Sequence, residues 1–278
     1  SLDSAAVLFL LSHSPAGFLP TRAGLLMFGS DVCAEHTNAA VTFEAVGPHE
    51  WLAQSFGEDA EAEVVSNSES KLSSSFSGML WTQLDALLDI LSQVNRQFRL
   101  KEETSRMVRP FAPLAIKEMI VNALAHRDYA DTEPVRVIVT PQSIKVQSPG
   151  GLVAEVQAEL TGTDIESFIK SGGRNVKGYR NPVVAALFYG GGAMDHTGSG
   201  LKDLWEETVA NNGQAEFGPT NDNSVFQVEI SARPEAVDRI TNTAVPEDID
   251  TVRFAANIIP VAHLPEFVWH AGVTKKAA

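Results

Sequence analysis

Residues 113–129 read PLAIKEMIVNALAHRDY, and this stretch decides the fold. Helical spacing gathers its apolar side chains on one side: Ile116, Met119, Ile120, Ala123 and Leu124. Glu118 and Asn122 are four residues apart, so a carboxylate and an amide share the nearly opposite face. The helix then runs into the polar cluster 126–129, which is denser than an ordinary helix end. We therefore expect chemistry on this helix.

The composition indicates a globular protein. The chain has 278 residues, 44% of them apolar, which suffices for one large or two medium domains. A single cysteine, Cys33, excludes a disulfide framework and a thiolate zinc cluster, and we interpret it as apolar filler. No apolar run approaches the roughly 18 to 20 residues that span a bilayer, and residues 1–14 lack a signal-peptide pattern. We expect a cytoplasmic protein with no membrane partner.

The net charge of −14 argues against a general nucleic-acid binder, because phosphate contacts supply most of the affinity of such proteins. One local patch differs in charge. Lys170, Arg174, Lys177 and Arg180 lie close together in a stretch without acids. Such a patch suits a compact anion, for example the phosphates of a nucleotide, better than a duplex.

Secondary structure in the first hundred residues follows from spacing and composition. Residues 4–12 have the character of a helix end, and 25–28 are either a buried strand or a short helical turn. Alternation predicts a strand over 39–47. The acidic, serine-rich stretch 57–78 is typical of an exposed connection. Leucine at helical spacing predicts a long amphipathic helix over 79–100.

The second half of the chain alternates short strands with helices. Proline near the first turn favours a helix that starts close to residue 113. The remaining predicted elements are a hairpin of 135–140 with 143–147, a loop over 153–170 with one helical turn at 164–170, helices over 182–189 and 201–211, and strands near 215–217 and 224–230. Leu201, Leu204, Trp205 and Val209 are expected to face the core. This order predicts an α+β unit.

The residue types on the central helix and in the later glycine turns suit nucleotide hydrolysis. An amide such as Asn122 can hold Mg²⁺ together with phosphate oxygens, while Glu118 orients or deprotonates the attacking water. Backbone amides of the turn at 198–200 would receive phosphate oxygens at the positive end of the next helix. Each signal alone is more often a plain turn or a solvated face, so their order and spacing carry the hypothesis.

Four motifs in order resemble a known family. They are EMIVNALAHRDY (118–129), SIKVQSPGGL (143–152), GYRNP (178–182) and HTGSGLKDL (196–204). Together they resemble the C-terminal ATP-binding domain of bacterial proteins named as RecG-like helicases or transcriptional regulators. That domain is a divergent relative of the GHKL ATPases, which include gyrase, Hsp90, histidine kinases and MutL. Upstream, FLPTRAGLLMFGSD (18–31) resembles the end of a Schlafen AlbA-like DNA-binding domain.

The resemblance implies a fold and a domain scheme. The expected fold class is α+β, a GHKL-like (Bergerat) two-layer sandwich of mixed sheet and helices with an N-terminal α/β portion. The scheme is the end of the AlbA-like domain at 1–60, a connection with a long helix at 61–109, the ATP-binding domain at 110–232 and a C-terminal extension at 233–278. The chain would then begin late in the AlbA-like domain, and DNA contact would come from the region before it.

The resemblance also implies roles for single residues. Glu118 would be the water-activating base and Asn122 the Mg²⁺ ligand. The nucleotide-binding residues would be Asn122, Ser148, Pro149, Gly150, Gly151, Arg180, Asn181, Thr197, Gly198, Ser199 and Gly200. The turn at 149–151 would lie beneath the adenine. The Arg-Asn pair at 180–181 would either contact phosphate or anchor a helix start, and an ion pair of Arg127 with Asp128 would fix the turn at 126–129.

One departure from the family pattern leaves two functions open. GHKL ATPases place an aspartate, which accepts the amino group of adenine, where this chain has Ser148. The first hypothesis is the ATP-binding part of a bacterial DNA-associated regulator, with ATP and Mg²⁺ as cofactors and slow hydrolysis. The alternative is a degenerate, non-hydrolysing module for protein assembly or DNA positioning.

Other activities and partners are weighed from the same motifs. Helicase activity is not expected, because the chain has no G-x-x-x-x-G-K-[ST] loop. A small-molecule-responsive regulator would need a helix-turn-helix, which residues 233–278 do not suggest. The expected partner is a nucleotide. GHKL relatives often dimerise, so a homodimer is kept as an option.

Overall fold

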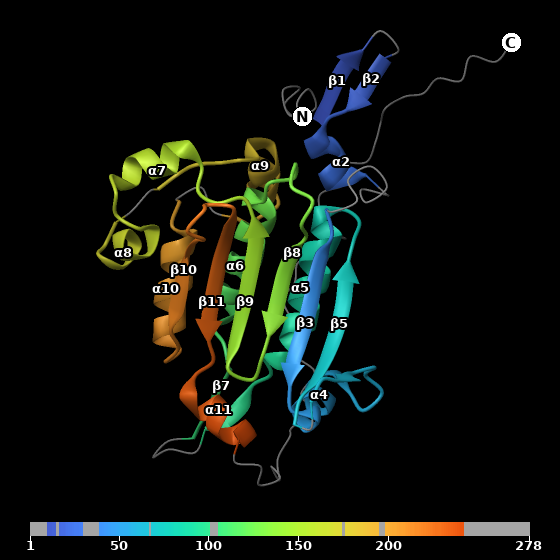
Figure 1. Cartoon of the computed structure of the whole chain (residues 1–278), viewed down its shortest axis with the longest axis vertical. Coiled ribbons are helices and arrows are strands. Elements are labelled where there is room, and N and C mark those ends of the chain that lie inside the picture. The colour runs from blue at the N-terminus through green and yellow to red at the C-terminus, as the bar shows by residue number, and fades with distance from the viewer. Residues whose placement is uncertain are drawn as a thin grey trace, which may run out of the picture. The chain divides into compact units, whose positions relative to one another are not determined.

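A mixed sheet of seven strands forms one layer of the described part of the chain (Figure 1). Its order is β10-β11-β9-β8-β3-β5-β4, and β3 with β8 is the parallel pair. The strands are β3 (Val41–Gly47), β4 (Glu63–Val64), β5 (Ser70–Phe76), β8 (Val135–Val139), β9 (Ser143–Pro149), β10 (Ala215–Pro219) and β11 (Val225–Ser231). Alternate residues of β3 are fully buried, so one face of the sheet belongs to the core.

The computed structural model describes residues 10–14, 17–29, 39–66, 68–100, 105–173, 176–194 and 198–241. All of them lie in one compact unit that spans residues 1–245. Of the predicted C-terminal extension 233–278, residues 242–278 lie outside the described residues.

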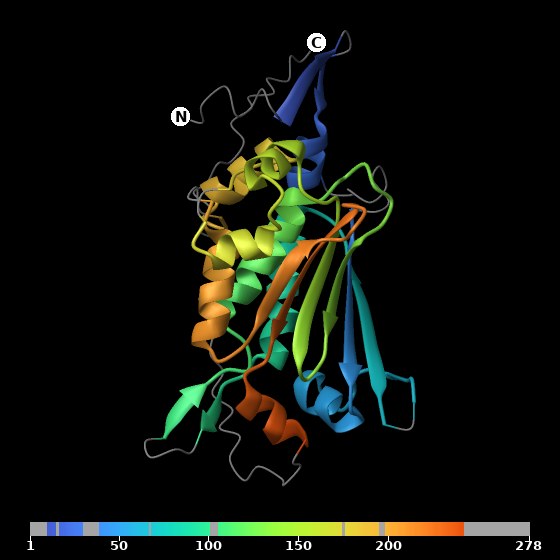
Figure 2. The same ribbon diagram turned by 60° about the vertical axis from the view of Figure 1, so that its left-hand side comes forward.

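Helices α5 (Leu80–Val94), α6 (Pro113–His126) and α10 (Gly200–Ala210) form the second layer, against the buried face of the sheet (Figure 2). Helix α6 is central, since it contacts α5, α10 and β9. Its buried residues include three alanines and five larger apolar side chains on several sides of the helix, so neighbours pack around it rather than on one stripe. The sheet and α6 together hold the core.

Shorter elements complete the unit. They are β1 (Leu11–Ser14), β2 (Gly17–Pro20), α2 (Arg22–Phe28), α4 (His49–Phe56), β6 (Phe98–Leu100), β7 (Arg106–Val108), α7 (Ala154–Leu160), α8 (Ile165–Lys170), α9 (Pro182–Gly190) and α11 (Pro234–Thr241). Strands β1 and β2 pair with each other, as do β6 and β7. Asp164 starts α8 by accepting a hydrogen bond from the Ser167 amide at 2.7 Å.

The predicted fold class, an α+β two-layer sandwich with a mixed sheet, is confirmed. The helix predicted near residue 113 is α6, and the predicted hairpin is β8 with β9. The predicted helices over 182–189 and 201–211 are α9 and α10, and the last two strands are β10 and β11. For residues 25–28, the helical alternative holds, because they lie in α2.

The serine-rich stretch predicted as an exposed connection contains a strand instead. Residues 70–76 form β5, which pairs antiparallel with β3 over its whole length. Composition misled here, because small polar side chains are typical of loops. Leu72 and Phe76 nevertheless alternate toward the core, and β3 supplies the backbone partners.

Four further expectations are corrected. The helix predicted over 79–100 ends at Val94, and Phe98 lies in β6. The loop predicted over 153–170 contains α7 as well as α8. The helix end predicted over 4–12 falls at Leu10, which is helical, whereas Leu11 and Ser12 already belong to strand β1, and residues 4–9 lie outside the described residues. On α10, Val209 is 49% exposed and Thr208 is buried in its place.

The sheet joins the segments that the sequence assigned to different domains. Strand β3 comes from 1–60, β4 and β5 come from 61–109, and the other four strands come from 110–232. Their ladders are continuous across these boundaries, so the described residues fold as one unit. None of the helices described is both long and apolar enough to cross a membrane.

Candidate functional site

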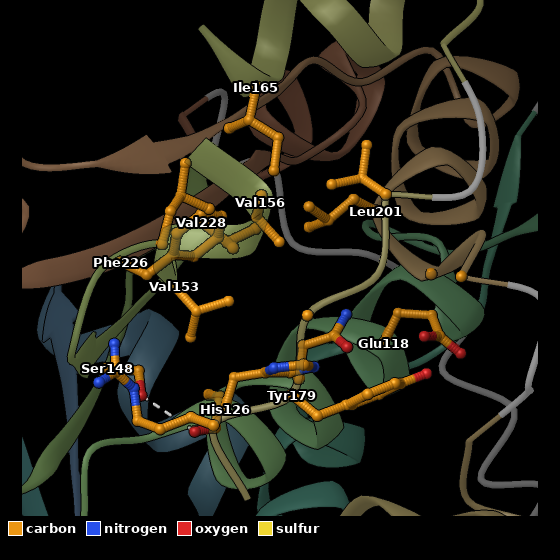
Figure 3. A pocket seen from close by; sticks show the side chains of 18 of the residues that line it. Glu118, His126, Ser148, Val153, Val156, Ile165, Tyr179, Leu201, Phe226 and Val228 are labelled. Carbon is orange, nitrogen blue, oxygen red and sulfur yellow. Dashed lines mark hydrogen bonds between the residues drawn. The ribbon is translucent and has the colours of Figure 1, made fainter. Parts of the chain in front are cut away.

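A cavity of about 140 Å³ lies between α6 and the β9–β11 part of the sheet. Helices α7, α8 and α10 and the segment 176–180 complete its wall. Figure 3 shows Glu118 and Ser148 toward opposite sides of the view, with His126 and Tyr179 between them. The polar groups of the cavity therefore follow the length of α6.

The opposing wall is apolar. Its side chains come from β9, β11, the three flanking helices and the residue before α7, namely Val146, Val153, Val156, Ile165, Ile169, Leu201, Phe226 and Val228. Figure 3 labels Val153, Val156, Ile165, Leu201, Phe226 and Val228 among them. Ile165 and Ile169 are one helical turn apart on α8, which places both on the cavity side. A wall of this kind, with few polar groups opposite, is typical of a pocket for a flat organic ligand.

Glu118 and Asn122 converge on the start of α10. A Cβ placed on Gly200 would lie 2.7 Å from Glu118 Oε2 and 3.2 Å from Asn122 Nδ2. Only glycine allows this approach of α10 to α6, because any other residue would displace the carboxylate or the amide. A carboxylate and a carboxamide thus meet at the positive end of a helix.

The Asn122 amide is poised for a ligand. Its Nδ2 is buried and has no hydrogen-bond partner among the described residues. A buried amide without a partner is unusual in a folded protein and costs stability. Rotation of the carboxamide exchanges its nitrogen and oxygen, so the group can offer either a donor or a metal-ligating oxygen.

Ser148 lies at the other end of α6 and is used there as a donor. Its hydroxyl donates to the Ala123 carbonyl at 2.9 Å, and its side chain is buried. The oxygen of this hydroxyl keeps its lone pairs, so Ser148 can still accept a hydrogen bond in the cavity. Pro149 does not line the cavity, and its carbonyl accepts from the Asp128 amide at 2.7 Å.

Arg180 crosses the glycine turn after β9. It donates to the Gly151 carbonyl at 3.0 Å and pairs with Asp128 at 3.4 Å. Gly150 has a φ of 92°, and a Cβ there would lie 2.9 Å from Arg180 Nε, so glycine is needed for both reasons. Asp128 thus pairs with Arg180 across the turn, and the ion pair of Asp128 with Arg127 stays a prediction.

Arg127 and Asn181 hold the end of α6. Arg127 is buried, donates to the Glu133 carbonyl at 2.7 Å and lies 5.1 Å from the Tyr129 ring centre. The Asn181 amide donates to the carbonyls of Ala125 and Arg127, at 3.0 and 2.7 Å. Asn181 does not line the cavity, so of its two expected roles the structural anchor is the one observed.

The His126 ring faces the cavity and stacks on Tyr179. The ring centres are 5.6 Å apart and the planes differ by 17°. Burial, together with the positive charge of Arg180, lowers the pKa of His126 from 6.5 to about 4. The imidazole is therefore neutral near pH 7 and offers one donor and one acceptor to the cavity.

The start of α10 carries a second carboxylate. The Ser199 hydroxyl donates to Asp203 Oδ2 at 2.5 Å, and the Ser199 carbonyl accepts from the Asp203 amide. Gly198, Gly200 and Asp203 line the cavity, whereas Ser199 does not. The titratable lining thus holds two acids, Glu118 and Asp203, opposite two cations, Lys177 and Arg180.

The cavity collects most of the residues that the sequence singled out. Those that line it are Glu118, Asn122, Ser148, Gly150, Gly151, Arg180, Gly198 and Gly200. Thr197 lies outside the described residues. Sequence reasoning missed Tyr179 and Asp203, although both lie inside quoted motifs, so proximity to the motif residues was the available signal. His126 belongs to the polar cluster 126–129, and Lys177 belongs to the basic patch that was expected to suit a compact anion.

No family model matches the chain, and no curated protein is significantly similar to it. Among solved structures, the chain is similar to the DIP2311 protein from Corynebacterium diphtheriae, with 21% sequence identity and a TM-score of 0.57. The match covers 82% of this chain and 41% of that protein, so the chain spans about two fifths of its length. At this identity the likeness shows a shared fold alone.

The lowered pKa of His126 predicts a pH dependence of stability. The unfolded imidazole takes up a proton near pH 6.5, and the folded one only near pH 4. The free energy of unfolding should therefore fall as the pH drops from about 6.5 to about 4, and His126→Gln should remove this part of the fall. NMR titration of the histidine ring protons and urea unfolding across that range measure it. A His126 resonance that titrates near 6.5 would contradict the burial described.

Proposed function

We propose that the chain is a nucleotide-binding unit that takes ATP with Mg²⁺ and hydrolyses it slowly. The meeting of Glu118, Asn122 and Gly200 carries this proposal, since it sets a carboxylate and an unpartnered amide at a helix N-terminus. Helix N-termini favour phosphate, and their backbone amides are ready donors. Such a combination suits the phosphate end of a nucleotide.

Mg²⁺ would offset the repulsion between the phosphates and the carboxylates of the site. The titratable lining offers as many carboxylates as cations, so a triphosphate alone would meet repulsion from Glu118 and Asp203. Among the described residues no group of three His, Cys, Asp or Glu side chains could hold a metal. Mg²⁺ bound to nucleotides commonly takes one or two protein oxygens and fills its other positions with phosphates and water. The carboxamide of Asn122 fits that requirement, and the ion would neutralise phosphate charge.

Glu118 would be the base for hydrolysis. Its carboxylate is largely buried and lies beside the turn that would receive the phosphates. From there it would hold the attacking water and take its proton as the water oxygen bonds to phosphorus and the bond to the leaving phosphate oxygen breaks. The packing of α10 against α6 would limit the access of bulk water to this side of the site.

The apolar wall would hold the base of the nucleotide. Phe226, Val228 and Val156 offer apolar contact surface for the base, and Ser148 and neutral His126 provide the few polar atoms. Because the Ser148 hydrogen is donated to α6, its oxygen is left to accept from an amino group, as on adenine. The basic segment near Lys177 and Arg180 would add contacts to the polar part of the ligand.

The wider context is proposed from the resemblance. The four ordered motifs support a divergent GHKL-like ATP-binding domain of a bacterial DNA-associated regulator of the RecG-like type, working in the cytoplasm and not itself a helicase. DNA binding would come from a Schlafen AlbA-like region, of which residues 18–31 resemble the end. Binding of the nucleotide would then regulate the DNA-binding region.

Asn122→Ala tests the binding site. Loss of a hydrogen bond or ligand to a charged group costs about 1.5–3 kcal/mol, so ATP affinity with Mg²⁺ should fall about tenfold or more. Isothermal titration of the wild-type chain and the variant measures this, and Gln54→Ala on the exposed side of α4 is the matched control. Absence of heat with millimolar nucleotide and the wild-type chain would refute ATP binding.

A second candidate function is a non-hydrolysing module that keeps the fold for assembly or DNA positioning. The use of Ser148 as a structural donor favours it, because the position lacks a carboxylate to fix the adenine amino group.

Phosphate release separates the two candidates. A general base contributes about 10²–10⁴ in rate, so Glu118→Gln should lower turnover by that factor while ATP binding persists. Glu155→Gln, at an exposed position of α7, serves as the control. If wild type binds ATP and its phosphate release equals that of the Glu118 variant, the non-hydrolysing function holds.

A further inference from the structure

The two edges of the seven-stranded sheet differ in whether their outward backbone groups have hydrogen-bond partners. On the outer side of β10, side chains of α8 bind the backbone. Lys170 Nζ donates to the Ala215 carbonyl at 2.9 Å, and Glu166 Oε2 accepts from the Phe217 amide at 3.1 Å. Lys170 and Glu166 also pair with each other at 2.6 Å. This edge is therefore closed to another strand.

The opposite edge of the sheet runs along β5, and only the first residues of β5 are paired there. Strand β4 pairs with Ser70 and Lys71 of β5, and no described strand pairs with 72–76 on this side. The Glu69 carbonyl accepts from the Val65 and Ser66 amides on the β4 side. Backbone groups alternate in direction along a strand, so those of Ser73 and Ser75 also point outward.

The uncovered stretch 72–76 reads LSSSF and has none of the usual protections of an edge. It contains no charge and no proline, and its register with β3 runs without a bulge. Ser73 and Ser75 are exposed, while Leu72 and Phe76 are only partly buried. Figure 1 shows β5 at the border of the sheet. A flat, neutral edge with free donors and acceptors is a template for strand addition.

We propose that a second copy of this chain pairs with this edge, β5 against β5, antiparallel and centred on Ser74. The register is self-complementary, because it sets Leu72 of one copy opposite Phe76 of the other, twice, on the core side. Ser73 and Ser75 exchange backbone hydrogen bonds across the two-fold axis. One sheet then runs through both copies, and this dimer does not depend on a nucleotide.

Charge near the edge also favours a second copy. In this register the start of β4, at Glu63, meets the turn at 77–79 of the other copy, just before its α5. That helix has no side-chain cap and no acid in its first turn. Glu61 and Glu63, at and before the start of β4, are exposed, so their carboxylates in one copy would complement the positive helix end of the other. No charged residue faces its own symmetry mate within 72–76.

The net charge of −14 opposes association at longer range. Added salt screens this repulsion, so dimerisation should strengthen with ionic strength. A basic peptide bound at the same edge, beside Glu61 and Glu63, would behave in the opposite way. The short ladder places the interface at the small end of the range for specific complexes, and we expect a dissociation constant in the micromolar range or weaker.

Sedimentation equilibrium of the full chain over a wide concentration range tests the proposal. Wild type should show a reversible monomer–dimer equilibrium. Ser75→Pro removes an outward amide and should lose the dimer, while Ser75→Ala keeps the amide and should match wild type. A wild type that stays monomeric, or a Ser75→Pro variant that dimerises equally, overturns the proposal.

Amide hydrogen exchange tests it in the wild type, without a substitution. The amides of Ser73 and Ser75 should exchange more slowly as protein concentration rises, whereas the inward amide of Ser74 already pairs with β3. A dimer that forms with no change at Ser73 and Ser75 would place the interface elsewhere and refute this surface.

Discussion

The carbonyl end of α6 is the constraint on which the site depends. The last carbonyls of a helix have no partner within it, and burying them without one is costly. Here Ser148 binds the Ala123 carbonyl, the Tyr129 hydroxyl binds that of Leu124 at 2.7 Å, and Asn181 binds that of Ala125. One strand end, one turn and one helix start are thereby fixed to the same few ångströms of α6.

The hydrogen bonds at the end of α6 also determine where the polar side chains of the cavity lie. Because these bonds fix the end of α6, they also fix the orientation of the helix about its own axis. In that orientation Glu118 and Asn122 face α10. Gly200 completes the arrangement, since its lack of a Cβ lets α10 approach the carboxylate and the amide. Stability is spent at Asn122, whose buried amide nitrogen has no partner among the described residues. Such a cost is common at functional sites.

The sequence predicted what depends on period and local chemistry. Apolar spacing located α6, α10 and the β8–β9 hairpin, and glycine turns marked both ends of the cavity. It failed where tertiary partners decide. Residues 70–76 become a strand because β3 is beside them, and α7 is short enough to look like a loop. The donor role of Ser148 was also out of reach, because its acceptor lies 25 positions away in the chain.

Gly200→Ala is the most direct test of the central claim, that α10, Glu118 and Asn122 form one site for a nucleotide with Mg²⁺. The added methyl group would fall 2.7 Å from Glu118 Oε2, whereas at Gly190, on α9, no atom lies within 4 Å of a new Cβ. Titration of both variants with ATP and Mg²⁺, with thermal unfolding to check the fold, compares them. We predict that Gly200→Ala loses binding and Gly190→Ala keeps it. Equal affinities for the two folded variants would contradict the proposed site.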